Sequence, residues 1–239
     1  MNLLLVDDDV VSRMALLDLA QALQVHHGLP PLTLVEAEDG EAAWTLLEEG
    51  LAPVLVLCDV QMPKLSGLDL LKRARAERSF VEQPFVLVTS AADVSTVRQS
   101  LSLGVSYYVV KPFATEAARA SLDVPFLAIL DKAMERPRAT QARLKFTGER
   151  LQGYLQAFLT QIAQAQAEQE AWRVSEDCKS RLDALATGCL TLGLWWGAKL
   201  AKRLQEEGRR LGAERLRASL SSLQGIVEWQ LEVVRLAAR

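Results

Sequence analysis

The sequence predicts an α/β domain built on a doubly wound, five-stranded parallel sheet, followed by an all-α domain. In the first half of the chain, short apolar segments alternate with amphipathic segments, which is typical of α/β folds. After about residue 140 the strand pattern disappears. Residues 1–139 carry seven more acidic than basic side chains, whereas residues 140–239 carry four more basic than acidic, and this change indicates two domains.

The expected strands are apolar runs with little polar alternation, which is typical of strands buried on both faces. They span residues 3–6, 32–37, 54–58, 85–88 and 107–110, and helical patterns lie near residues 10–25, 40–49, 66–78 and 93–103. In such a sheet, ligands bind at the carboxyl ends of the strands. Polar side chains at these ends are Asp7, Asp8, Asp59, Thr89 and Lys111. We therefore expect these side chains to meet at one edge of the sheet.

Three of these side chains are carboxylates, which repel one another unless a cation neutralises them. Oxygen ligands suit Mg²⁺, which uses only a few carboxylates and keeps several waters. A lysine and a threonine hydroxyl beside them complete a site able to hold a phosphoryl group. Taken alone, "VDDD" is also compatible with unrelated acidic loop residues.

Four segments occur together in this half of the chain: "LLLVDDD", "LVLCDVQMPKLSGLDLL", "FVLVTSA" and "YYVVKPF". In order and spacing, residues 1–113 resemble the receiver domain of bacterial two-component response regulators. The resemblance implies a flavodoxin-like fold and a phosphoacceptor, Asp59, which would take a phosphoryl group from a phosphohistidine. Lys111 would pair with Asp59, and Thr89 and Tyr108 would form the switch. The implied Mg²⁺ ligands are Asp7, Asp8, Asp59 and the backbone carbonyl of Gln61.

One segment departs from the family pattern. The last helix of the family starts almost directly after the lysine–proline motif, whereas here "FATEAARASLDV" precedes Pro125. Because proline suits a first helical turn, we expect this helix at residues 125–135, after an insertion. The insertion puts in doubt the usual receiver dimer face, to which this helix contributes.

The second half of the chain shows four apolar stripes at helical spacing, within residues 151–162, 178–192, 197–204 and 216–234. They predict an antiparallel four-helix bundle. Pro137 in "MERPRATQ" is expected to end the preceding helix and to mark a linker. The predicted domains are therefore residues 1–136 and 147–239, joined by a linker at residues 137–146.

Within the bundle, "RLDALATGCLTLGLWWGAKLAKRLQEEGR" resembles the central helix pair of a histidine phosphotransfer (HPt) domain. In this register Asp183 occupies the histidine position, Ala186 the lysine position and Thr187 the glycine position. No histidine follows His27. The resemblance therefore implies a degenerate, pseudo-HPt domain that cannot carry a phosphoryl group.

Several other residues can be explained either by an ordinary structural role or by a functional one. His26 and His27 can bind a metal, but the sequence offers no further ligand, so a solvated loop is favoured. Cys178 and Cys189 share a helix face, which favours core packing over redox chemistry. Trp195 and Trp196 are adjacent, so at least one should approach the surface, either as a partly buried side chain or as part of an interface with a protein partner.

Together these observations predict a response regulator of a two-component phosphorelay, whose switch controls protein–protein interactions of the pseudo-HPt domain. We do not expect an enzyme. We expect a phosphoacceptor whose only activities are its own phosphorylation by small phosphodonors and its own dephosphorylation. Expected partners are a sensor histidine kinase or HPt protein, other signalling proteins and a second copy. The alternative is a transcription regulator, although no helix-turn-helix pattern or basic recognition helix supports nucleic-acid binding. Without a signal peptide or membrane-length apolar run, a cytoplasmic location is expected.

Overall fold

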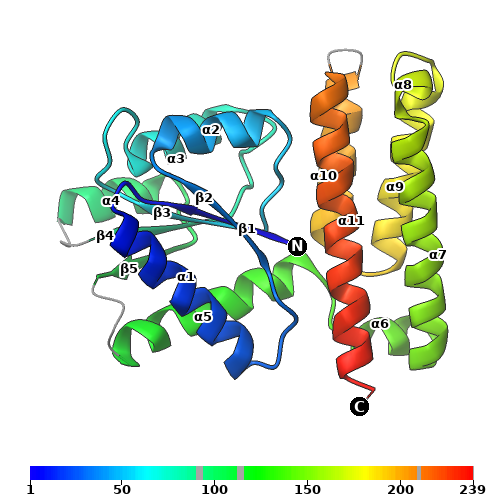
Figure 1. Cartoon of the computed structure of the whole chain (residues 1–239), viewed down its shortest axis with the longest axis horizontal. Coiled ribbons are helices and arrows are strands. Elements are labelled where there is room, and N and C mark those ends of the chain that lie inside the picture. The colour runs from blue at the N-terminus through cyan, green and yellow to red at the C-terminus, as the bar shows by residue number, and fades with distance from the viewer. Residues whose placement is uncertain (90–93, 112–115, 209–210, 239) are drawn as a thin grey trace. The chain divides into compact units, whose positions relative to one another are not determined.

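A computed structural model of the chain describes residues 1–89, 94–111, 116–208 and 211–238 (Figure 1). Two compact units can be distinguished. The first consists of Asn2–Leu47 and Pro53–Ile129, and the second of Met1, Glu48–Ala52 and Leu130–Arg239. No helix within the described ranges is long and apolar enough to span a membrane.

The first unit contains a parallel sheet of five strands in the order β2-β1-β3-β4-β5. These strands are β1 (Asn2–Val6), β2 (Thr33–Ala37), β3 (Leu55–Asp59), β4 (Phe85–Thr89) and β5 (Tyr107–Val110). All five residues of β3 and of β4 are buried, as expected for central strands covered on both faces. The predicted five-stranded parallel sheet and its flavodoxin-like arrangement are confirmed.

Helices lie on both faces of this sheet (Figure 1). They are α1 (Val10–His26), α2 (Gly40–Glu48), α3 (Gly67–Ala76), α4 (Val94–Ser102) and α5 (Glu116–Ala133). The first and last of them, α1 and α5, cover one face, and α2 and α3 cover the other. Side-chain caps fix where two of them begin, because Asp9 accepts a hydrogen bond from the Ser12 N–H and Ser66 accepts one from the Asp69 N–H.

The expected start of the last receiver helix at Pro125 is wrong. Helix α5 begins at Glu116 and continues through Pro125. A proline inside a helix removes a backbone hydrogen bond and costs about 3 kcal/mol. Leu122, Phe126 and Ile129 are nevertheless all buried on either side of the proline, and burying each such side chain stabilises by about 1.5–3 kcal/mol. This continuous apolar face outweighs the lost bond, so the helix does not restart at the proline.

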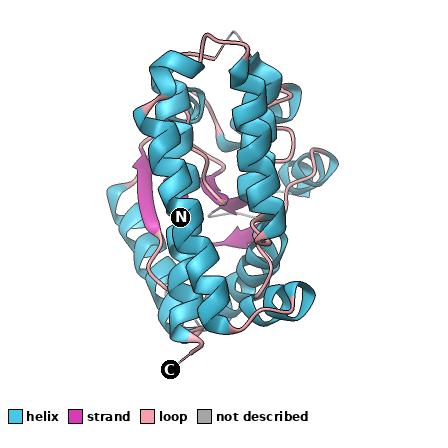
Figure 2. Cartoon of the chain, turned by 90° about the vertical axis from the view of Figure 1, so that its right-hand side faces the viewer, coloured by secondary structure: helices cyan, strands magenta, loops and turns pink. Residues whose placement is uncertain are grey.

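The second unit is largely helical. Its helices are α6 (Pro137–Leu144), α7 (Gly148–Ala167), α8 (Gln169–Trp172), α9 (Asp177–Thr191), α10 (Trp195–Glu207) and α11 (Ala213–Leu236). The long helices run lengthwise beside one another, with α9 packed on α10 and α7 on α11 (Figure 2). The segment predicted as a linker contains α6, because Pro137 starts a new helix after the preceding one has ended.

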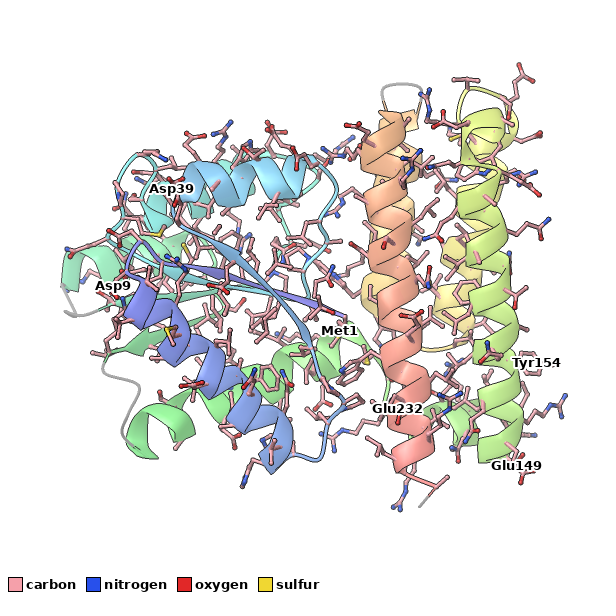
Figure 3. The ribbon with its side chains drawn as sticks, in the orientation of Figure 1. Met1, Asp9, Asp39, Glu149, Tyr154 and Glu232 are labelled. Atoms are coloured by element: carbon pink, nitrogen blue, oxygen red, sulfur yellow. The ribbon has the colours of Figure 1, made fainter. Side chains whose placement is uncertain are left out.

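Each of the four predicted apolar stripes lies on one of the long helices of this unit. On α7, for example, Leu151, Leu155 and Ile162 are buried, whereas Tyr154 projects outward from the helix (Figure 3). Gly188 of α9 has no room for a side chain, because a β-carbon there would overlap the ring of Phe158 on α7. The three cysteines, Cys58, Cys178 and Cys189, are buried free thiols, and the core packing expected of the last two is consistent with this.

Candidate functional site

The carboxyl ends of neighbouring strands bring the predicted polar residues to one edge of the sheet. Asp7 and Asp8 directly follow β1, and Asp59 is the last residue of β3. Thr89 ends β4, and Lys111 directly follows β5. The parallel register aligns these ends, since Val6 pairs with Cys58, Asp59 with Val88, and Thr89 with Val110.

Lys111 joins two of the carboxylates. Its Nζ donates to Oδ2 of Asp7 at 2.7 Å and to Oδ2 of Asp59 at 3.1 Å. The other oxygen of Asp59, Oδ1, accepts a hydrogen bond from the Val60 N–H at 2.7 Å. Asp59 is 7% exposed and Asp7 is fully buried. The lysine therefore provides a positive charge where two buried carboxylates meet.

Asp7 is also held by the start of α1. The Ser12 hydroxyl donates to its Oδ2 at 2.6 Å, and the Asp9 N–H donates to its Oδ1 at 3.0 Å. Arg13 Nη1 donates to the Asp7 backbone carbonyl at 2.6 Å. Asp9 itself lies at the amino-terminal end of α1 (Figure 3), where its side chain caps the helix. Ser12 and Arg13 were not predicted, and the only sequence signal for them is their place in the first turn after the aspartates.

Asp7, Asp8 and Asp59 each offer a carboxylate oxygen, and these three oxygens lie within 4.8 Å of one another. Asp8 is exposed, so the cluster is open to water on one side. A set of hard oxygen donors with room for water fits Mg²⁺. Gln61, the predicted backbone ligand, is exposed in the loop after β3, two residues beyond Asp59.

Charge and burial shift the acid–base behaviour of these groups. Burial raises the pKa of Asp59 above its ordinary value, against the opposing effect of Lys111. Burial alone would lower the pKa of Lys111, but its hydrogen bonds to Asp7 and Asp59 outweigh that effect and raise it. Burial, followed by the charges of Asp59 and Asp7, also raises the pKa of the Cys58 thiol, which therefore stays protonated beside the site.

The two residues of the predicted switch lie on adjacent strands. Thr89 is buried at the end of β4, and Tyr108 is half-buried on β5. The Tyr108 hydroxyl is buried and has no hydrogen-bond partner within the described part of the chain. A buried hydroxyl without a hydrogen-bond partner costs free energy.

The loop after β3 is shaped by a glycine. Gly67 begins α3 directly beneath this loop, and its N–H donates to the Val60 carbonyl at 3.1 Å. Lys64 in the same loop adopts a left-handed backbone (φ 61°), and its ammonium group pairs with Asp39 at the start of α2. These contacts fix the path of the chain next to Asp59.

The predicted site residues of the second unit lie on its helices. Asp183 is exposed on α9. Trp195 is half-buried, with the Arg143 guanidinium 5.9 Å from its ring centroid, whereas Trp196 is 7% exposed. Only Trp195 of the pair is therefore available at the surface.

Comparison with known proteins supports the resemblance of the first unit to receiver domains. Residues 3–123 match the response regulator receiver domain. The chain is 32% identical to the chemotaxis protein CheY1 of Helicobacter pylori over 124 residues, which cover 52% of this chain and 95% of that protein. It is 31% identical to chemotaxis protein CheY-3 of Vibrio cholerae over 126 residues, covering 53% and 92% respectively.

A crystal structure of a response regulator receiver protein from Pseudomonas putida is 26% identical, with a TM-score of 0.42, and the match covers 55% of this chain and 95% of that one. The family match extends over half of this chain and includes the whole carboxylate–lysine site. The chain therefore belongs to the response regulator receiver-domain family of two-component signalling proteins.

Proposed function

We propose that Asp59 accepts a phosphoryl group from a phosphohistidine of a sensor histidine kinase or HPt protein, and that this modification controls protein–protein interactions of the helical second unit. The observation that carries the proposal is the position of Lys111, which donates to both Asp7 and Asp59 within the carboxylate cluster. A purely structural ion pair would not require a third carboxylate, Asp8, on the open side of the same cluster.

The chemistry is the transfer of a phosphoryl group between two nucleophiles. An oxygen of Asp59 attacks the phosphorus in line, and the phosphorus–nitrogen bond of the phosphohistidine breaks. The electron pair of that bond returns to the imidazole, and Asp59 becomes an acyl phosphate. Lys111 already lies 3.1 Å from Oδ2 of Asp59, so its ammonium group can pair with a phosphoryl oxygen after transfer.

The cluster fits Mg²⁺ as a cofactor. The residues that would hold it are Asp7, Asp8, Asp59 and the backbone carbonyl of Gln61. A bound Mg²⁺ offsets the negative charge of the carboxylates and of the incoming phosphoryl oxygens. In its absence, Lys111 is the cation that keeps Asp7 and Asp59 together.

Phosphorylation would be transmitted through Thr89 and Tyr108. The Thr89 hydroxyl lies at the end of β4, next to the strand that carries Asp59, and would bind the new dianion. The Tyr108 hydroxyl, which has no hydrogen-bond partner among the residues that the structure describes, would gain one if its ring shifted once Thr89 moves. The response is then a change of population between two conformations of one fold.

The protein would have no turnover of its own beyond phosphorylation from small phosphodonors and loss of the phosphoryl group to water. Its phosphorylated form is the signal. The transcription-regulator alternative is not favoured, because residues 140–239 show no helix-turn-helix pattern and no basic recognition helix.

For the second unit, we propose a pseudo-HPt four-helix bundle built from α7, α9, α10 and α11. Asp183, at the histidine position of the resemblance, is exposed on α9, where a phosphorylatable imidazole would need to lie. If the register moves by one residue, Gly188 takes the glycine position and Ala184 the histidine position, and neither carries an imidazole. Such a bundle would dock a receiver, a kinase or a second copy, with Trp195 at the contact.

The test of the phosphoacceptor uses the full chain. Wild type and Asp59→Asn are incubated with acetyl phosphate and Mg²⁺, and intact masses are compared, with Asp183→Asn as the matched control. We expect labelling of wild type and Asp183→Asn, and its loss in Asp59→Asn or when Mg²⁺ is chelated. Equal labelling of wild type and Asp59→Asn would overturn the assignment.

The Asp59→Asn variant also tests the second unit. Because this variant lacks the proposed phosphoacceptor, any phosphoryl group that it takes up must be on another residue, such as one in the helical second unit. The variant is incubated with a separate phosphorylated receiver, and acid-labile phosphate is measured together with binding. We expect binding without transfer. Phosphate on the helical unit would contradict the pseudo-HPt proposal, and binding that is unaffected by Trp195→Ala would remove Trp195 from the contact.

A further inference from the structure

The histidine pair does not lie in the solvated loop that the sequence favoured. His26 is the last residue of α1, and His27 is its carboxyl-terminal cap. The next residue, Gly28, has φ +59°, and the helix ends in a Schellman motif: the Gly28 N–H donates to Val25 O and the Leu29 N–H to Gln24 O. Both histidines are therefore attached to a backbone fixed by hydrogen bonds.

A third side chain, from a distant part of the sequence, faces this pair. Asp123 lies on α5, and its Oδ1 atom is 2.5 Å from the Nε2 atom of His27. The two histidine rings lie edge to face, with centroids 4.8 Å apart. One ring nitrogen of each histidine and one oxygen of Asp123 all lie within 4.8 Å of one another. His27 and Asp123 are partly buried, and His26 is exposed.

We propose that His26, His27 and Asp123 form a binding site for a divalent transition metal, with Zn²⁺ as its best representative. Two imidazole nitrogens and one carboxylate oxygen are ligands that suit Zn²⁺ and related ions, whereas Mg²⁺ prefers oxygen ligands. Three protein ligands leave a fourth position for water or for a group from another molecule. The exposed side chain of His26 keeps this position open to solvent.

The present distances require only side-chain adjustment to admit the ion. Tetrahedral Zn²⁺ with bonds of about 2.0–2.1 Å places its ligand atoms about 3.3 Å apart. The His27–Asp123 pair would open by less than about 1 Å from its present separation, and the His26 ring would approach them. The metal takes the place of the hydrogen between His27 Nε2 and Asp123 Oδ1, and the neutral His27 ring then carries its proton on Nδ1.

One feature of the fold favours a cation here. The carboxyl-terminal end of α1 carries the partial negative charge of a helix dipole. Helix α1 has 17 residues, so the histidine pair lies about 25 Å along the helix from Asp9 and the carboxylate cluster. The histidine site is thus separate from the Mg²⁺ site and is made of a different kind of ligand.

The simpler interpretation is a histidine–carboxylate pair that only links α1 to α5. His26 distinguishes the two, because it has no part in that pair but is required as a metal ligand. His26 is also exposed, so replacing it leaves the packing of α1 intact.

The experiment titrates Zn²⁺ into the metal-free full chain with excess Mg²⁺ present, so that the carboxylate cluster is occupied. Calorimetry gives stoichiometry and affinity, and Co²⁺ substitution gives the absorption spectrum of a tetrahedral site. We expect one Zn²⁺ per chain. The variants His26→Gln, His27→Gln and Asp123→Asn should each weaken binding by at least about tenfold.

Asp59→Asn is the matched control and should retain the zinc site. Circular dichroism checks that every variant is folded, and His26→Gln remains decisive if the other two variants unfold. Zinc affinity that is unchanged in His26→Gln, or that is lost in Asp59→Asn, would overturn the proposal. The same holds if wild type binds no Zn²⁺ in the presence of Mg²⁺.

Discussion

Gly67 lies directly against the backbone of Asp59, so close that a β-carbon at position 67 would overlap the Asp59 carbonyl oxygen. The glycine of the "MPKLSG" segment is therefore required for close approach of α3 to the end of β3. Its φ is not in the left-handed region, so space and not backbone conformation makes glycine necessary here.

We expect Gly67→Ala to lower the free energy of unfolding by about 1–3 kcal/mol, because the added methyl group must displace backbone atoms. It should also slow phosphorylation, since the displaced backbone carries Asp59. Chemical denaturation and the acetyl phosphate assay measure the two effects. Gly153→Ala is the control: a β-carbon there meets no neighbouring atom, so α7 should keep its stability or gain.

We expect Lys111→Met to lower the free energy of unfolding by about 1–3 kcal/mol when Mg²⁺ is absent, because the buried carboxylates of Asp7 and Asp59 lose their shared cation. Added Mg²⁺ should reduce the difference from wild type. The comparison is made by denaturant titration. Lys72→Met, which removes only an exposed pair with Asp69, should have little effect. Equal stability of Lys111→Met and wild type without Mg²⁺ would contradict this role.

We expect Thr89→Ala to be phosphorylated at Asp59 but to respond less. Without the hydroxyl, nothing at the end of β4 draws toward the new phosphoryl group, and Tyr108 keeps its present position. Hydrogen exchange of the β4 and β5 amides, measured with and without acetyl phosphate, reports the response. A full response in Thr89→Ala would place the switch at another residue.

The second unit should lose stability in acid partly through Glu135. Its carboxylate accepts hydrogen bonds from Arg143 and Thr140, and the bond from Arg143 is the main reason that its pKa lies below the ordinary value of 4.5. A lowered pKa means that the ionised form contributes stability above pH 4.5, and that this contribution is lost as the pH falls through the lowered pKa.

Glu135→Gln should therefore cost about 1 kcal/mol of unfolding free energy near neutral pH and less in acid. Denaturation at a series of pH values from neutral to below 4.5 provides the measurement. Glu149→Gln, at the exposed start of α7 (Figure 3), controls for the loss of one carboxylate. If Glu135→Gln lowers the free energy of unfolding by the same amount in acid as at neutral pH, the effect comes from packing and not from the ionised carboxylate.

The sheet and the placement of Asp59, Thr89 and Lys111 could be predicted because strand periodicity and the order of motifs are local properties of the sequence. Helix α5 could not, because the burial that carries it through Pro125 depends on the tertiary fold. Ser12 and Arg13 lie in the first turn of α1, close to Asp7 in sequence, but their contacts depend on the geometry of the turn between β1 and α1, which no residue pattern marks. Asp123 lies 96 positions from His27, so no local pattern connects them.

The two oxygens of Asp59 are not equivalent. Oδ1 accepts from the neutral backbone N–H of Val60, the first residue of the loop after β3, whereas Oδ2 accepts from the charged side chain of Lys111. The carboxylate plane is consequently fixed, and a half-turn of the group would exchange a backbone partner for an ammonium group. Under the proposed function, an arriving phosphoryl group would therefore meet two inequivalent oxygens, one held by the backbone and one held by Lys111.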